Sequence, residues 1–285
     1  MKFSIIVVSL NPGNKLKKTL ESIFRQTCTD YEVVIKDGGS RDGSVDMWKD
    51  DGNGDAVTEF GELPASRVRF FDEPDKSIYE AMNQAVSHAR GEFILFLNCG
   101  DMFANERVLE RVASVMERTL SAKSTSGRKQ CHYVFYGDTL SEKNGVAIAA
   151  APEISGFTCY RNIPCHQSCF YSAGLCREKP YDLQYKIRAD YDHFLWCFYK
   201  AKAEMIHLEF PVAVYEGGGY SESKENRRRD TQEHKEITET YMSKSELLKY
   251  KTVMALTLAP LRTKMADNKV FSGFYHRVKE RVYRR

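Results

Sequence analysis

Apolar and polar positions in the first half of the chain alternate between a strand pattern and a helix pattern. Apolar runs rich in β-branched residues predict strands buried on both faces, and they lie at Phe3–Val8, Tyr31–Ile35, Val68–Phe71 and Phe93–Leu97. Between them, apolar residues at helical spacing predict amphipathic helices over Leu16–Phe24 and Ile78–Ala89. Strands separated by helices of this length predict an α/β fold, Rossmann-like, with a mostly parallel central sheet and helices on both faces.

The second half continues the strand pattern and then becomes charged. Strands are predicted at Tyr133–Tyr136, Ser168–Tyr171, Glu204–Leu208 and Val212–Tyr215, and a helix at Tyr191–Tyr199. From Asn226 onward the chain is helical and rich in charge. We therefore expect one α/β catalytic domain, residues 1–225, and a helical, basic C-terminal extension, residues 226–285.

The charge of the chain is placed unevenly. The net charge is +3, with 42% hydrophobic and 28% charged residues, which is typical of a soluble globular protein. Lys and Arg gather from Lys244 to Arg285 beside apolar Val253, Leu256 and Leu261. This mixture predicts peripheral contact with an anionic membrane or a helix packed on the catalytic domain. No nucleic-acid reading module accompanies the basic residues, so nucleic acid is not an expected partner.

The sequence also favours a reducing compartment. The apolar run at Met1–Leu10 is too short for a signal core or a membrane span. The eight Cys are then expected to be free thiols, and the absence of any CxxC pair argues against a zinc site. We expect a cytoplasmic protein, with a peripheral place at the inner face of the plasma membrane as the alternative that the basic tail raises.

Each early strand ends in polar residues. The clusters are Ser9–Asn11, Asp37–Ser44, Asp72–Lys76 and Asn98–Asp101. Ligands of such sheets bind beyond the carboxyl ends of the strands, so these clusters should meet in one crevice. Glycines allow close approach of a ligand, and carboxylates on tight turns can hold Mg²⁺ or Mn²⁺. The sequence predicts a metal-assisted nucleotide site, although each cluster alone has the composition of an ordinary turn.

At these residues the chain resembles the inverting glycosyltransferases of family 2, which have the GT-A fold. The resemblance covers residues 2–220 and is carried by SIIVVSLN (Ser4–Asn11), YEVVIKDGGSRDGS (Tyr31–Ser44), EPDKSIYEAMNQAVSHARGEFILFLNCGD (Glu73–Asp101), PCHQSCF (Pro164–Phe170) and IRADYDHFLW (Ile187–Trp196). The LNxGD form resembles the branch found in bacterial polysaccharide gene clusters, including the colanic-acid type.

The resemblance implies a role for each candidate site residue. It implies that Asp190 is the catalytic base, that Asp37 binds the nucleobase, and that the other nucleotide-binding residues are Ser9, Asn11, Asp75 and Asn83. It places Asp101 and Asn98 at the metal, and His166 and Gln167 on the acceptor side. The acidic motif reads Asn98-Cys99-Gly100-Asp101 where many members carry more carboxylates, so we expect weaker metal affinity. Asp190 could alternatively cap the following helix.

The resemblance implies a hexosyl transfer with inversion. The donor would be a nucleotide sugar, UDP-linked in most of the family, with Mn²⁺ or Mg²⁺ as cofactor. The acceptor would be a hydroxyl of a glycan or lipid-carrier-linked glycan in cell-surface polysaccharide synthesis. Two alternatives stay open: a non-catalytic sugar-nucleotide-binding protein, which the thinned acidic motif suggests, and a sugar nucleotidyltransferase, for which Asn11–Asn14 is a poor phosphate loop.

Overall fold

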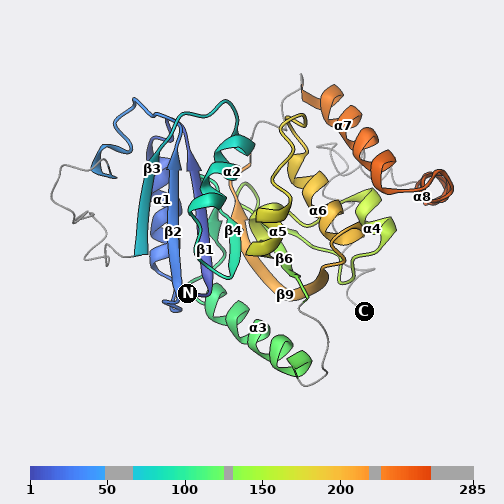
Figure 1. Ribbon diagram of the computed structural model, residues 1–285, viewed down its shortest axis with the longest axis horizontal. Coiled ribbons are helices and arrows are strands. Elements are labelled where there is room, and N and C mark those ends of the chain that lie inside the picture. Colours follow the sequence, from blue (N-terminus) through green and yellow to red (C-terminus); the bar gives the residue numbers. More distant parts are fainter. Residues whose placement is uncertain (49–66, 125–130, 218–225, 258–285) are drawn as a thin grey trace. The chain divides into compact units, whose positions relative to one another are not determined.

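The first half of the central sheet consists of parallel strands. In the computed structural model, which describes residues 1–48, 67–124, 131–217 and 226–257, they are β1 (Phe3–Ser9), β2 (Tyr31–Asp37), β3 (Val68–Asp72) and β4 (Phe93–Phe96). Their order is β3-β2-β1-β4, and all three pairings are parallel (Figure 1). Every residue of β1, β2 and β4 is buried, as expected of strands covered on both faces.

The second half of the sheet is mixed. It continues from β4 through β8 (Cys169–Ser172), β6 (Tyr133–Ser141), β9 (Glu204–Tyr215) and β5 (Met102–Phe103), with β7 (Ala147–Ile148) beside β6. β6 pairs in parallel with β9, whereas β4 with β8, β6 with β8, β6 with β7 and β5 with β9 are antiparallel. The predicted α/β fold class is confirmed. The predicted parallel pairing is found throughout the first half of the sheet, whereas the second half is mixed.

The strand β9 is continuous, although the sequence pattern predicts two separate strands, Glu204–Leu208 and Val212–Tyr215. The ladder between β6 and β9 is irregular near Asp138, which lies opposite Pro211. Proline has no N–H to donate to a ladder, so the irregularity is expected at this position. The strand continues past it because the residues on both sides keep pairing with β6.

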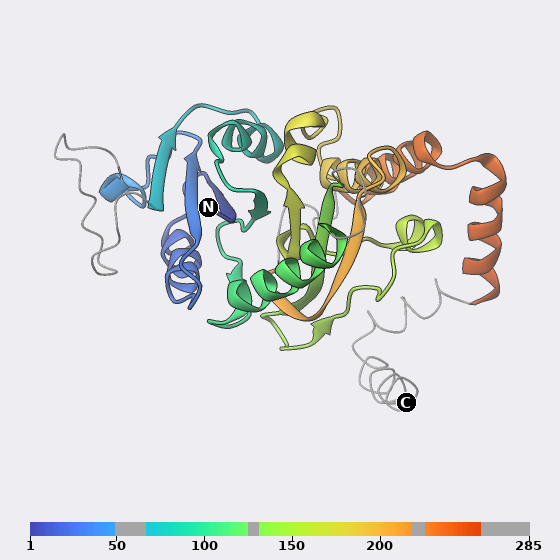
Figure 2. The same ribbon diagram turned by 60° about the horizontal axis from the view of Figure 1, so that its bottom comes forward.

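Helices cover both faces of the sheet. They are α1 (Asn14–Phe24), α2 (Ile78–His88), α3 (Val108–Ser124), α4 (Gly156–Arg161), α5 (Ala173–Glu178) and α6 (Ala189–Tyr199), with short 3₁₀ turns η1 (Asp46–Trp48) and η3 (His166–Ser168). α1 and α2 lie on opposite sides of β1 and β2 (Figure 2). The helices α1, α2 and α6 were expected from the sequence; α3, α4 and α5 were not.

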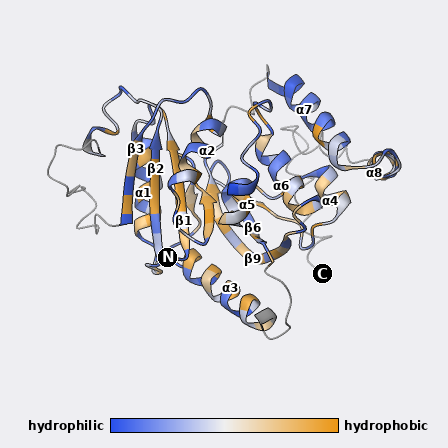
Figure 3. Ribbon diagram, in the orientation of Figure 1, coloured by the Kyte–Doolittle hydropathy of each residue, from blue (hydrophilic) through white to orange (hydrophobic). Residues whose placement is uncertain are grey.

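The main core lies between the sheet and the α1 and α3 side. Phe3, Ile5 and Val7 of β1 pack there with Leu20 of α1 and Val112 of α3, all 0% exposed. Figure 3 shows the apolar character concentrated in the strands and on one side of each of these helices. This packing fixes the strand ends that carry the polar clusters.

The C-terminal helices are α7 (Asn226–Tyr241) and α8 (Lys244–Leu256). The chain separates into two compact units, Met1–Ile237 and Thr238–Arg285, so the boundary falls within α7. The N-cap of α8 is Ser243, whose side chain and backbone form a capping box with Glu246. None of the helices in the described ranges combines the length and the apolar character that a membrane span requires.

Candidate active site

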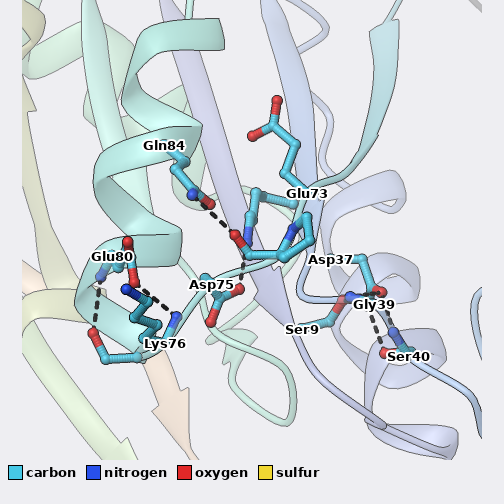
Figure 4. Close-up of polar contacts among 12 residues, drawn as sticks. Ser9, Asp37, Gly39, Ser40, Glu73, Asp75, Lys76, Glu80 and Gln84 are labelled. Carbon is cyan, nitrogen blue, oxygen red and sulfur yellow. Dashed lines mark hydrogen bonds and ion pairs between the residues drawn. The ribbon is translucent and has the colours of Figure 1, made fainter.

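Asp37 ends β2 and organises the turn that follows. The carboxylate is 0% exposed. Its Oδ1 accepts hydrogen bonds from the hydroxyls of Ser9 (2.7 Å) and Ser40 (2.6 Å), and its Oδ2 accepts from the backbone N–H groups of Gly39 (2.9 Å) and Ser40 (2.6 Å) (Figure 4). Burial raises the pKa of Asp37, but these hydrogen bonds outweigh it and hold the pKa below its usual range. The turn therefore carries a stable negative charge.

The acceptor capacity of Asp37 is fully used by the protein. A carboxylate offers about four lone-pair sites, and four hydrogen bonds occupy them here. Gly39 has a φ of 91°, a conformation that glycine adopts without strain and that turns two N–H groups toward the carboxylate.

Asp75 lies against the same turn. It forms an ion pair with Lys36, whose side chain is 0% exposed, while that of Asp75 is 9% exposed. A Cβ at Gly38 would lie 2.7 Å from Asp75 Oδ2, so glycine at this position leaves room for the carboxylate. The segment before α2 is braced by Glu80 Oε2, which accepts from the N–H of Lys76 at 2.7 Å (Figure 4).

The two asparagines predicted to bind the nucleotide have different surroundings. Asn11 has a φ of 47° and ties the end of β1 to the β2 turn: its N–H donates to Ser40 Oγ (2.7 Å), and its Oδ1 accepts from the N–H of Arg41 (2.9 Å). Asn83 instead makes two hydrogen bonds to the backbone of Tyr181. Its Nδ2 donates to the carbonyl oxygen (2.9 Å), and its Oδ1 accepts from the N–H (2.8 Å). Its amide holds a neighbouring segment to α2.

Asp101 lies at the end of the acidic motif with the carboxyl end of β9 beside it. Asp101 is 6% exposed, and its Oδ1 accepts from the N–H of Glu216 at 3.1 Å. Burial raises the pKa of Asp101 to about 6, although the Glu216 hydrogen bond and the charge of His166 oppose the rise. Glu216 also pairs with Lys15 of α1 at 2.7 Å. A Cβ at Gly100 would lie 2.3 Å from Glu216 Oε2, so the β9 end packs directly on the motif.

His166 joins the acidic motif to Asp190. Its Nε2 lies 3.1 Å from Asn98 Nδ2, and its Nδ1 lies 3.5 Å from Asp190 Oδ2. Burial lowers the pKa of His166, but Asp190 outweighs this and leaves the pKa raised. Burial raises the pKa of Asp190, but His166 and Tyr79 outweigh this and leave it lowered. Both shifts favour an ionised Asp190.

Tyr79 of α2 holds Asp190 from the other side. Its hydroxyl donates to the carbonyl of Ile187 at 2.6 Å and lies 3.0 Å from Asp190 Oδ1. Burial, with the nearby Asp190 charge, raises the pKa of Tyr79 well above its usual range, so the phenol stays protonated. Asp190 is thus fixed between a phenol and an imidazole.

Asp190 is not the helix cap that the sequence allowed. α6 starts at Ala189 with Arg188 as N-cap, so Asp190 lies inside the first turn. Asp192 faces a different partner: it is 4% exposed, and its Oδ2 lies 3.1 Å from Lys179 Nζ. The two carboxylates therefore face different partners, as residues two apart on a helix must.

The predicted residues fall into two connected groups and two outliers. Ser9, Asn11, Asp37 and Asp75 gather at the β2 turn, and Asn98, Asp101, His166 and Asp190 follow the acidic motif. Burial raises the pKa of Cys99 to about 12, and the charges of Asp37 in one group and Asp101 in the other add to the rise. Asn83 is committed to Tyr181, and Gln167 is 3% exposed within η3.

Sequence reasoning missed Lys36, Tyr79, Glu216 and Lys15. Lys36 is a charged residue inside an apolar strand, which signals a buried partner. Tyr79 lies within the conspicuous stretch Glu73–Asp101. Glu216 carries no sequence signal, because it reaches Asp101 only through the antiparallel pairing of β9 with β5.

Comparison with known proteins identifies relatives over most of the chain. Over 221 residues it is 33% identical to the PGL/p-HBAD biosynthesis glycosyltransferase of Mycobacterium bovis (strain BCG / Pasteur 1173P2), covering 77% of this chain and 78% of that protein. An uncharacterized glycosyltransferase of Mycobacterium tuberculosis is 26% identical over 194 residues, 67% of each chain.

Solved structures share the fold. The S. aureus TarS fragment 1–349 in complex with UDP has a TM-score of 0.59 and 19% identity, with 84% of this chain and 64% of that chain covered. The match to a longer TarS chain covers 37% of it. The mannosyltransferase PcManGT from Pyrobaculum calidifontis, in complex with GDP-Man and Mn²⁺, has a TM-score of 0.59 and 14% identity. The match covers 96% of this chain and 83% of that chain. These structures confirm the predicted GT-A fold.

The family of the protein follows from a match over a long part of the sequence. The matched residues include every candidate site residue except Asp190. Residues 4–171 match the family described as Glycosyl transferase family 2. That span is more than half of the chain, and the M. bovis relative at 33% identity carries the same activity in its name. This protein is a glycosyltransferase and belongs to glycosyl transferase family 2.

Proposed function

We propose that the protein transfers a hexosyl group from a nucleotide-sugar donor to an acceptor hydroxyl with inversion of the anomeric centre. One observation carries the proposal: Asp190, His166 and Asn98 form a continuous chain of contacts. The base candidate is thereby linked to the motif at which the diphosphate would depart. An inverting displacement requires the base and the leaving group at one site, on opposite faces of the sugar, and this chain of contacts supports the first of these requirements.

Asp190 acts as the general base in this proposal. Its carboxylate has a lowered pKa and is 23% exposed, so it is ionised near neutral pH and open to an acceptor. It takes the proton of the acceptor hydroxyl while that oxygen attacks the anomeric carbon. His166 and Tyr79 keep the carboxylate oriented.

The β2 turn holds the nucleotide. Asp37 would bind a base N–H in place of the Ser9 or Ser40 hydroxyl that donates to it here, and Asp75 would help to position the nucleotide. Ser9 and Asn11 would line the nucleoside pocket. The structural neighbour TarS was solved with UDP and with UDP-GlcNAc, which supports a UDP-linked donor. Asn83 would contribute indirectly, by holding the Tyr181 segment to α2.

The oxygen atoms at the acidic motif fit a divalent cation that arrives with the diphosphate. Among the described residues, Asn98 Oδ1 is buried with no hydrogen-bond partner, and Asp101 supplies a carboxylate beside it. In that same part of the chain, no three His, Cys, Asp or Glu side chains form a metal site on their own. Mg²⁺-type ions commonly use one or two carboxylates plus substrate phosphates, and PcManGT was solved with Mn²⁺. A bound cation would neutralise charge on the leaving diphosphate.

The acceptor in this proposal is a glycan or lipid-carrier-linked glycan of bacterial cell-surface polysaccharide synthesis, met at the cytoplasmic leaflet. The mycobacterial relative is named for PGL/p-HBAD biosynthesis, which supports a role in a biosynthetic pathway. Leu248 and Leu256 of α8 are 68% and 78% exposed within the basic tail, which supports peripheral contact with anionic lipid. His166, and Gln167 on the same turn, would border the acceptor. The colanic-acid branch stays a prediction.

The test measures products rather than binding. The purified chain is incubated with UDP-, GDP- and dTDP-sugars, Mn²⁺ and glycolipid acceptors, and free nucleoside diphosphate is measured with the anomeric configuration of the product. We expect acceptor-dependent release of one diphosphate and an inverted product. Nucleotide binding without release would favour the sugar-nucleotide-binding alternative. Pyrophosphate release in a parallel incubation with UTP and a sugar 1-phosphate would favour the nucleotidyltransferase.

A further inference from the structure

One buried carboxylate of α7 binds three consecutive backbone N–H groups just before α6. Glu233 is 4% exposed. Its Oε1 accepts from the N–H of Lys186 at 2.9 Å, and its Oε2 accepts from those of Ile187 and Arg188, each at 2.9 Å. Glu233 therefore holds the backbone that leads directly into the first turn of α6.

This contact holds the N-cap of α6 and the two residues before it. The first N–H groups of a helix have no partner within it, and a side chain near the N-cap usually accepts from them. Among the described residues, the N-cap of α6, Arg188, makes no such side-chain contact. Glu233 instead binds the N–H of the N-cap and of the two residues before it, and a negative charge at this end also suits the helix dipole.

The held segment is the one that positions Asp190. The carbonyl of Ile187 accepts from Tyr79, whose hydroxyl also contacts Asp190. The peptide groups around Ile187 are thus bound by Glu233 at N–H and by Tyr79 at C=O. A change at Glu233 acts on Asp190 through this backbone, without touching a substrate.

Further contacts bind the same face of α7 to α6. Asp230 Oδ1 lies 2.8 Å from Arg188 Nε. The ring of His234 stacks on Tyr191 with centroids 5.2 Å apart and an interplanar angle of 20°. Residues 230, 233 and 234 share one helix face at spacings of three and four. One face of α7 therefore packs against the start of α6 and the residues just before it.

We infer that Glu233, with the α7 face formed by Asp230, Glu233 and His234, is a positioning device for the base Asp190. The inference rests on the proposed role of Asp190 and extends it. It assigns the first turns of the C-terminal extension, expected from the sequence to lie outside the catalytic domain, to the transfer reaction itself.

The experiment compares Glu233→Ala with Glu236→Ala in the full chain. Glu236 lies on the exposed side of α7, where it pairs with Gln232, so its loss is a matched control. We expect Glu233→Ala to lower kcat by about tenfold to a hundredfold, the size of effect that a misplaced reacting group produces. Nucleotide affinity should stay within about twofold of the parent value, because the nucleotide turn is untouched. Glu233→Gln, which keeps one acceptor oxygen, should fall between.

A double variant separates positioning from general loss of structure. In an Asp190→Asn background, Glu233→Ala should cause no further loss of turnover, because the group that it positions is already disabled. Equal losses of kcat and nucleotide affinity would overturn the inference, and so would a parental kcat in Glu233→Ala. If Glu233→Ala does not fold, Asp230→Ala provides the same comparison at a half-buried pair: reduced kcat with unchanged nucleotide affinity supports the inference, and parental kcat overturns it.

The two proposals fail differently. If Asp190→Asn retains turnover, the assigned base is wrong whatever Glu233 does. If Asp190→Asn is inactive while Glu233→Ala turns over normally, the transfer proposal stands and the positioning role is wrong.

Discussion

His166 Nδ1 lies 3.5 Å from Asp190 Oδ2. The other nitrogen of the same ring lies 3.1 Å from the Asn98 amide. One imidazole thus bridges the residue proposed to accept a proton and the motif proposed to hold the diphosphate. A neutral ring with its proton on Nδ1 can donate to Asp190 and accept from Asn98 at once.

Replacing His166 with Phe should shift the pH dependence of kcat. Burial raises the pKa of Asp190, and His166 is the first opposing influence. Without the imidazole, the pKa of Asp190 rises, so the base is protonated over more of the acidic range. We expect the acidic limb of the kcat profile to move to higher pH. His88→Phe, at the β3 edge beside Glu73, is the control and should leave the limb in place. An unmoved limb in His166→Phe would contradict the electrostatic coupling.

Asp101→Asn should abolish the mutual enhancement of Mn²⁺ and nucleotide binding. Metal binding requires an ionised carboxylate, and the pKa of Asp101 is raised to about 6 by burial. Proton and cation therefore compete, and Mn²⁺ affinity in the parent protein should fall as the pH drops below about 6. Calorimetric titration of UDP with and without Mn²⁺ measures both effects. Asp30→Asn, at the opposite end of β2, is the control; Mn²⁺-enhanced UDP binding that survives Asp101→Asn would place the cation elsewhere.

Variants of the Lys36–Asp75 pair should distinguish a role in stability from a role in nucleotide binding. Removing one partner of a buried pair costs about 3–5 kcal/mol, so Asp75→Ala should lower the free energy of unfolding by that order. Adding Lys36→Met removes the unpaired charge and should restore much of the loss. Nucleotide affinity should stay reduced in the double variant if Asp75 positions the nucleotide. Full recovery of affinity would mean that the pair is purely structural. Denaturant unfolding and nucleotide titration check the two halves.

The first half of the fold could be read from the sequence because its signals are local. Strands such as Phe3–Ser9 and Tyr31–Asp37 are continuous buried runs, and their polar ends follow from strand direction. The register places Ser9 beside Asp37 and Asp37 beside Asp72. That these polar strand ends lie side by side was therefore predictable from the direction of the parallel strands.

The second half could not be read in this way because its pairings join distant segments. The antiparallel insertion of β8 between β4 and β6 leaves no periodic signal. Glu216 and Glu233 act on Asp101 and on the segment before α6 across long stretches of chain. A lone Glu in a charged stretch is typical of a solvated helix face, so the burial of Glu233 is visible only in three dimensions.

Asp190→Asn is the most direct test of the account. The asparagine keeps the size of the side chain and its contact with Tyr79 but cannot take a proton, so kcat should fall by about a hundredfold or more. Nucleotide affinity, measured on the same preparation with Mn²⁺ present, should match that of the parent protein. Parental turnover by the Asp190→Asn protein would contradict the account.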